Sequence, residues 1–163
     1  MFETAEFGVE ACERPLHSRE NGGHLIVRLK QHFAHRHELP LPLAHRLMTL
    51  TMIVGEALMV AMRQQRVAIV RNNYQDNGNW AYKKAQPDPQ LHVHIYGRTY
   101  GEIHPDNDPR FQAFPDALVF PDPATGYYDQ MVPLTTEDCA VIKIEIEKLL
   151  RSDKYIAFAS ELS

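Results

Sequence analysis

The longest regular pattern of apolar residues in the chain lies between residues 41 and 66. Apolar side chains recur there every three or four residues, at Leu43, Leu47, Leu50, Val54, Ala57 or Leu58, and Ala61. This spacing is typical of one face of an α-helix. A second apolar band consists of four methionines, Met48, Met52, Met59 and Met62. The pattern predicts a long core helix whose methionines pack either in the same core or against another surface, such as a second subunit.

Shorter stretches alternate between apolar and polar residues, which is typical of β-strands. They predict strands at residues 24–30, 66–72 and 90–100. A last helix is expected at about residues 135–151, with Thr135 or Thr136 as its cap. The stretch at residues 101–126 is rich in Pro and Asp and is expected to be a long loop. The order of strand, helix, strands and helix predicts a single α+β domain over residues 1–163, built on an antiparallel sheet.

Composition narrows the classes of function. The chain has 163 residues, of which 44% are hydrophobic and 23% charged, and this fits one globular domain. Its formal net charge of -4 argues against holding nucleic acid by bulk charge. Cys12 and Cys139 are far apart in the sequence and indicate free thiols in a reducing compartment. No signal-peptide pattern is visible, and charged residues interrupt the most apolar stretch, residues 43–62, so we expect a cytoplasmic protein without a membrane span.

The candidate chemistry lies in the stretch PDPQLHVHIYGR, residues 87–98. Side chains alternate between the two faces of a strand. One face is expected to direct Leu91, Val93 and Ile95 toward the core. The other face carries Gln90, His92, His94 and Tyr96, with neighbours about 7 Å apart. Two imidazoles at that spacing can address one phosphate group, the first by attacking phosphorus and the second by donating a hydrogen bond to an oxygen.

Three interpretations of His92 and His94 are compatible with the local spacing. They could be surface or structural histidines, a catalytic pair, or two ligands of a metal ion. A metal site needs a further ligand, for which His104 or one of the histidines at positions 32, 35 and 37 is a candidate.

The stretch QLHVHIYGR resembles the signature of the histidine triad (HIT) superfamily, in which three histidines alternate with apolar residues and a basic residue follows. Aligned on Arg98, His92 matches the middle histidine and His94 the last, while Gln90 stands in place of the first. The segment GGHLIVRLKQHF, the long helix, a strand ending in two asparagines and the dipeptide GN precede the row in the order typical of the superfamily. Some bacterial members are similar in having glutamine at the first position. The resemblance implies a HIT-like fold, with an antiparallel sheet of about five strands and two main helices.

The same resemblance implies a reaction. Superfamily members hold the α-phosphate of a nucleotide against the row, and the middle histidine forms a nucleotidyl-histidine intermediate that water or another acceptor resolves. Carried onto this chain, His92 is the nucleophile, His94 binds phosphate oxygens and Gln90 completes the row. The expected substrate is a nucleoside phosphoramidate or a dinucleoside polyphosphate with adenine or another purine as its base. No cofactor is required, although a divalent cation could arrive with the substrate, and the subunits are expected to pair as a homodimer.

Three further residues are candidates for binding the substrate, again by resemblance. Asn79 would donate to the α-phosphate, and Leu25 and Val27 would form walls of the base and ribose pocket, although both also fit plain core packing. The spacer after Asn79 is longer than usual, and Gln90 cannot titrate, so any proton transfer by a first histidine is lost. Two alternatives stay open: a nucleotide-binding regulatory protein of the same fold with little turnover, and a metal-dependent enzyme that uses the two histidines and His104.

Overall fold

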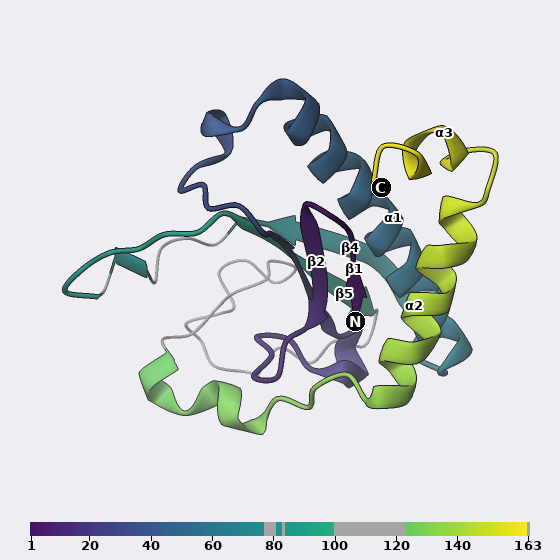
Figure 1. The fold of residues 1–163 in the computed structure, drawn as a ribbon. Helices are drawn as coiled ribbons and strands as arrows, with labels where there is room; N and C mark the ends of the chain where they lie inside the picture. Colours follow the sequence, from purple (N-terminus) through teal and green to yellow (C-terminus); the bar gives the residue numbers. More distant parts are fainter. Residues whose placement is uncertain (77–80, 83, 100–122, 163) are drawn as a thin grey trace.

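The computed structural model describes residues 1–76, 81–82, 84–99 and 123–162, which adopt an α+β fold (Figure 1). The strands are β1 (Phe2–Glu3), β2 (Phe7–Ala11), β3 (His24–Leu29), β4 (Ile69–Gln75) and β5 (His92–Thr99). The helices are α1 (Leu41–Gln64), α2 (Thr136–Leu150) and the short α3 (Ile156–Ala159). The strands pair in antiparallel fashion in the order β1-β2-β3-β5-β4. The expected antiparallel sheet of five strands with two main helices is confirmed.

Two parts of the sequence prediction differ from the structure. The sequence prediction contains neither β1 nor β2, because these strands are too short for alternation to stand out. Of the residues in β2, only Phe7 and Val9 are fully buried. β4 begins at Ile69 rather than at Arg66, since the turn that ends α1 extends to Arg66, where φ is +63°. Most of the expected loop at residues 101–126 lies outside the described residues. Its end and the residues after it form two short 3₁₀ turns, Pro123–Thr125 and Tyr127–Gln130.

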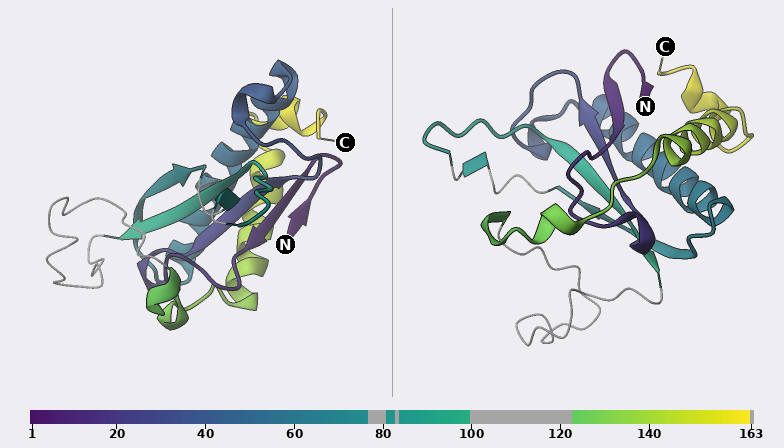
Figure 2. Two further views of the ribbon diagram at one scale, coloured as in Figure 1. Left: turned by 90° about the vertical axis from the view of Figure 1, so that its left-hand side faces the viewer. Right: turned by 90° about the horizontal axis from the view of Figure 1, so that it is seen from below.

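α1 crosses one face of the sheet, and α2 packs alongside it (Figures 1 and 2). The apolar stripe expected on α1 is buried, at Leu43, Leu47, Leu50, Val54, Ala57, Leu58 and Ala61. A Cβ at Gly55 would lie 2.0 Å from the Tyr74 hydroxyl oxygen, so glycine there leaves room for the Tyr74 side chain of β4 against α1. By length and composition α1 could cross a membrane, but 50% of its most apolar window is buried in the structure. That burial is what a core helix shows.

The methionine band of α1 is divided between the core and the surface. Met62 is completely buried, and Met59 is partly buried against the core. Met48 and Met52 are 56% and 46% exposed. Core packing is therefore confirmed for the C-terminal half of the band. Its N-terminal half leaves an apolar surface uncovered, and packing of that half against a second subunit stays a prediction.

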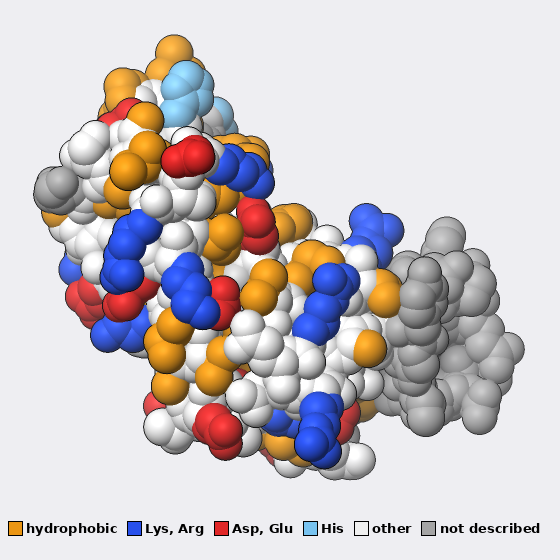
Figure 3. Space-filling model, turned by 90° about the vertical axis from the view of Figure 1, so that its right-hand side faces the viewer, with side chains coloured by type: hydrophobic (Ala, Val, Ile, Leu, Met, Phe, Trp, Pro, Cys, Tyr) orange, Lys and Arg blue, Asp and Glu red, His pale blue; other side chains and the backbone are white. Residues whose placement is uncertain are grey.

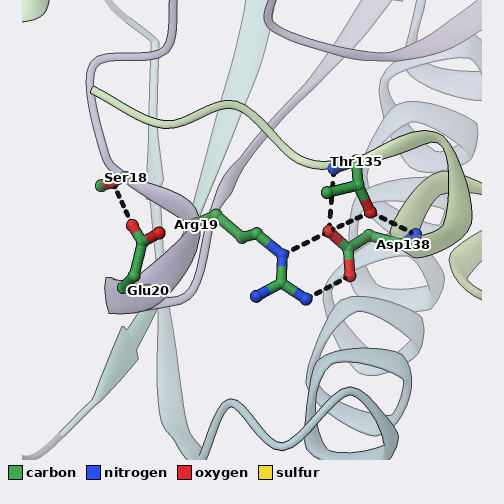
Figure 4. Close-up of polar contacts among 5 residues, drawn as sticks. All are labelled: Ser18, Arg19, Glu20, Thr135 and Asp138. Carbon is green, nitrogen blue, oxygen red and sulfur yellow. Dashed lines mark hydrogen bonds and ion pairs between the residues drawn. The ribbon is translucent and has the colours of Figure 1, made fainter. Parts of the chain in front are cut away.

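α2 begins at its expected N-cap residue, Thr135. The Thr135 hydroxyl accepts a hydrogen bond from the Asp138 N–H, and the Asp138 carboxylate accepts from the Thr135 N–H, which completes a capping box. Arg19 donates two hydrogen bonds to the same carboxylate (Figure 4). This contact ties the turn before β3 to α2. On the side of the molecule that carries α2 and α3, acidic and basic side chains are mixed among apolar ones (Figure 3).

The turn that precedes β3 is pressed against β5 at two glycines. Gly22 has a φ of +124°, and a Cβ there would lie 2.3 Å from the carbonyl carbon of Gly97. The Gly97 N–H donates to the Gly23 carbonyl oxygen at 3.1 Å. Only glycine combines this backbone conformation with so close an approach. The contact fixes the start of β3, and with it His24, beside the middle of β5.

Candidate active site

The two histidines of the predicted row lie side by side on one face of β5. Their ring centroids are 4.6 Å apart, and the ring of Tyr96 continues the row 5.8 Å from that of His94. The other face of β5 and the residue before it pack in the core through Leu91, Val93 and Ile95. The predicted alternation is confirmed, so His92 and His94 project from the face of the sheet opposite α1.

His92 is held in one tautomer by the backbone. Its Nδ1 lies 2.7 Å from the carbonyl oxygen of Gln90. A carbonyl oxygen can only accept, so Nδ1 must carry the proton and donate it. A neutral His92 therefore has its lone pair on Nε2, which is the atom available to attack an electrophile.

His94 is held in the opposite tautomer by His24 on β3. The Nδ1 of His24 accepts a hydrogen bond from the Leu16 N–H at 3.1 Å, and its Nε2 lies 2.8 Å from the Nδ1 of His94. Because its Nδ1 accepts, a neutral His24 carries its proton on Nε2 and donates it to His94. His94 then carries its own proton on Nε2. One imidazole of the row thus offers a nucleophile and its neighbour offers a hydrogen-bond donor.

Burial keeps His24 and His94 neutral. Their residues are only 1% and 6% exposed. Desolvation is the main cause that lowers the pKa of His24 to about 2 and that of His94 to about 3, and the charges of neighbouring histidines add to it. Both imidazoles are therefore uncharged near pH 7, as the assignment of their protons requires.

These lowered pKa values predict that stability falls as the pH is lowered from 6.5 to 5. In that range the unfolded chain protonates both histidines, while the folded protein keeps them neutral down to about pH 3. The free energy of unfolding should drop by about 1.4 kcal/mol per pH unit for each histidine. Urea unfolding at pH 7.5 and 5.5 measures the drop, and a His24→Gln variant should show a shallower dependence. Equal stability of the wild type at the two pH values would contradict the prediction.

Gln90 serves the row through its backbone as well as its side chain. It lies just before β5 and is partly buried, and its side-chain N–H donates to the Leu29 carbonyl oxygen at 3.2 Å. Its own carbonyl oxygen accepts a hydrogen bond from the Nδ1–H of His92. Gln90 therefore joins the end of β3 to the start of β5 and orients His92, without contributing a group that titrates.

Two side chains that the sequence analysis did not single out, His24 and Arg28, lie beside the row. In the antiparallel register, His24 pairs with Tyr96 and Arg28 pairs with His92. The alternation in HLIVRLK places residues 24, 26 and 28 on one face, and this is the signal that could have identified them. Their position next to the row depends on which strands pair, and local periodicity does not predict that.

Two solved structures with a similar fold are named as histidine triad proteins. A hypothetical histidine triad nucleotide-binding protein from Sulfolobus tokodaii strain 7 has a TM-score of 0.55 and 20% sequence identity, over 92% of this chain and 84% of that one. A histidine triad protein from Marinobacter aquaeolei VT8 has a TM-score of 0.52 and 20% identity, over 99% and 88% of the two chains. The chain has the fold of histidine triad proteins. No family model and no curated protein matches its sequence.

Within this histidine triad fold, the remaining predicted residues have different outcomes. Leu25 and Val27 are completely buried in the core, on the face of β3 opposite His24, and offer no surface to a ligand in this structure. Asn79 and His104 lie outside the described residues, so their roles stay predictions. Among the residues that the structure describes, no three His, Cys, Asp or Glu side chains are grouped as metal ligands.

Proposed function

We propose that the protein is a nucleotidyl hydrolase or transferase that acts at the α-phosphate of a nucleoside phosphoramidate or a dinucleoside polyphosphate, with adenine or another purine as the base. The observation that carries this proposal is the complementary protonation of two adjacent imidazoles. His92 presents an unprotonated Nε2, and His94 presents a protonated one. A nucleophile next to a fixed donor is what transfer at phosphorus needs, because charge develops on the phosphoryl oxygens as the nucleophile attacks.

The proposed reaction has two steps. The Nε2 of His92 attacks the α-phosphorus, an N–P bond forms, and the bond to the leaving group breaks with its electron pair going to the leaving atom. The Nε2–H of His94 donates to a non-bridging oxygen while negative charge grows there. Water or another acceptor then attacks phosphorus, its proton passes to solvent, the N–P bond breaks, and the nucleoside monophosphate or its ester leaves. Gln90 positions His92 throughout.

The proposal needs no resident cofactor, although a divalent cation could accompany a polyphosphate substrate. The similarity of the fold to a protein named as nucleotide-binding supports a nucleotide as the ligand. We also propose a cytoplasmic location, in keeping with two free cysteines. The metal-dependent alternative using His92, His94 and His104 has less support, because the Nδ1 of His94 accepts from His24 and its Nε2 then carries the proton and has no lone pair for a metal ion.

We further propose that the protein acts as a homodimer. Met48, Met52 and Tyr74 are each about half exposed and line an apolar cavity of about 510 Å³ between α1 and β4. β4 is the last strand of the sheet on that side in the described part of the chain. A second copy would cover the apolar surface and could extend the sheet.

The decisive experiment is to trap the covalent intermediate. Purified protein is mixed with adenosine 5′-phosphoramidate or diadenosine tetraphosphate and quenched at alkaline pH, since the N–P bond is labile in acid. Intact-mass analysis should show one added adenylyl group, peptide mapping should place it on His92, and AMP should appear in solution. His92→Gln should give neither adduct nor AMP. His32→Gln, which changes an exposed histidine paired with Asp88, should give both.

The same experiment separates the alternative of a nucleotide-binding protein with little turnover. Gln90 favours that alternative, because it cannot transfer a proton. Tight nucleotide binding without adduct or AMP in the wild type would support it. Unchanged AMP release by His92→Gln would overturn the assignment of the nucleophile.

A further inference from the structure

A cationic side chain projects beside the proposed nucleophile. Arg28 on β3 is the cross-strand partner of His92 on β5. Directly paired residues in an antiparallel sheet have their Cβ atoms about 4.5–5.5 Å apart and share a face. Val27 and Val93 are buried on the opposite face, so Arg28 and His92 project from the face of the row. The Arg28 side chain is 38% exposed, so a ligand bound at His92 can reach it.

The guanidinium of Arg28 has donors to spare. Its Nε and Nη2 donate to a single oxygen of Glu10, at 3.1 and 2.6 Å. A guanidinium carries five N–H groups in a planar fork that fits the oxygens of a phosphate. Burial and the neighbouring His92 are the larger causes of the lowered pKa of His94, and Arg28 is the third. The positive charge of Arg28 therefore acts on His94 in the row.

The protons available at the row also affect which leaving group can depart from phosphorus. An amine that leaves phosphorus must be protonated as it departs, whereas a phosphate can leave as an anion. Gln90 has no titratable proton, and its side-chain N–H donates to the Leu29 carbonyl oxygen. The first position of the row therefore lacks a titratable proton, while Arg28 supplies a cation beside His92.

We propose that Arg28 selects substrates whose leaving group is a phosphate chain, so that dinucleoside polyphosphates are preferred over phosphoramidates. This inference rests on the proposed function and narrows its substrate class. When His92 attacks the α-phosphorus, the bridging P–O bond breaks and its electron pair stays on the departing phosphate oxygen. The N–H groups of Arg28 that do not contact Glu10 stabilise that charge. Glu10 opposes the selection, because its carboxylate competes for the guanidinium and repels the phosphate.

The test compares two substrates that deliver the same adenylyl group, diadenosine tetraphosphate and adenosine 5′-phosphoramidate. Arg28→Gln should lower kcat/KM for the tetraphosphate by about 10–100-fold, the loss expected for a charge-assisted hydrogen bond, and change that for the phosphoramidate less than about 3-fold. Arg28→Lys should retain part of the preference. Glu10→Gln should act in the opposite direction and raise kcat/KM for the tetraphosphate. Arg151→Gln, which removes a positive charge from the end of α2, should leave the ratio of the two substrates unchanged.

The outcomes distinguish this inference from the proposed function. Adduct formation on His92 with both substrates, combined with an unchanged ratio in Arg28→Gln, would overturn the role of Arg28 and leave the proposed function intact. A pair that only joins β2 to β3 would make Arg28→Gln and Glu10→Gln change activity in the same direction, which would also overturn it. The absence of any adduct or AMP in the wild type would instead count against the proposed function. Thermal unfolding of each variant confirms that the comparison is made on folded protein.

Discussion

Replacing His24 with leucine is expected to lower kcat at the histidine row by about 10²–10³-fold, the cost of losing one donor to a developing oxyanion. Leucine cannot donate to the Nδ1 of His94, so nothing holds that imidazole in the tautomer with its proton on Nε2. Substrate binding through other contacts is retained, and KM should change much less than kcat. Steady-state kinetics with a dinucleoside polyphosphate measures both constants.

His24→Gln is the matched variant for this prediction. A glutamine side chain has an oxygen that can accept from the Leu16 N–H and an NH₂ group that can donate to His94, as His24 does. It should restore much of the rate that leucine loses. Nitrogen-15 NMR of the imidazole groups gives a readout independent of turnover: His94 should be protonated on Nε2 in the wild type and in His24→Gln, and should lose that preference in His24→Leu. A leucine variant with the wild-type tautomer and the wild-type kcat would contradict the assignment.

The contrast between His92 and His24 shows what local sequence can predict about this site. His92 and His94 are two residues apart, so the alternation of one strand is enough to place them on the same face. His24 reaches His94 from another strand, 70 residues away in sequence. Its place depends on the antiparallel pairing of β3 with β5, next to which Gly22 lies close against Gly97. Periodicity carries information within a strand, and a partner on another strand follows only from register.

The same distinction between local pattern and strand pairing explains which elements of the fold could be predicted. α1 was predictable because 24 residues repeat one apolar pattern, and the cap of α2 because Thr135 and Asp138 interact locally. β1 has two residues and β2 has five, so neither shows enough of a pattern. β2 is a strand because it pairs with the edge of β3, and β1 is a strand because it pairs with β2. For Leu25 and Val27 the sequence left two possibilities open, walls of a ligand pocket or plain core packing, and the structure packs both in the core.

Neutralising Asp138 is expected to have the largest effect on stability. Its carboxylate is 0% exposed and accepts four hydrogen bonds, two from the Arg19 guanidinium and two from the backbone N–H and hydroxyl of Thr135 (Figure 4). Burial alone would raise the pKa of Asp138, but these bonds outweigh it and lower the pKa below its usual value. Since the folded pKa is lowered, this stabilisation is present at neutral pH and is lost only as the pH falls below about 4.

Asp138→Asn should lower the free energy of unfolding at pH 7 by about 3 kcal/mol, because breaking one side of a buried ion pair leaves the other charge poorly solvated. Arg19 is 23% exposed and can regain some water, which places the loss at the lower end of the range for such pairs. Asp129→Asn is the control. It breaks an ion pair with Arg14 whose side chains are 64% and 83% exposed, and it should cost less than about 1 kcal/mol. Urea unfolding at pH 7 measures both.

The double variant Arg19→Met with Asp138→Leu decides whether the loss comes from an unpaired charge. Removing both charged groups together leaves no buried ion, so it should be less destabilising than Asp138→Asn. If the double variant is as unstable as the single one, the loss comes from the capping bonds with Thr135 instead. Equal effects of Asp138→Asn and Asp129→Asn would contradict the prediction.

The backbone N–H of Arg19 also donates to the Val132 carbonyl oxygen. Weakening the ion pair of Arg19 with Asp138 should therefore loosen the turn that holds Leu16, whose N–H donates to His24. We therefore expect Asp138→Asn to shift the tautomer of His94 in the same direction as His24→Leu, and by less.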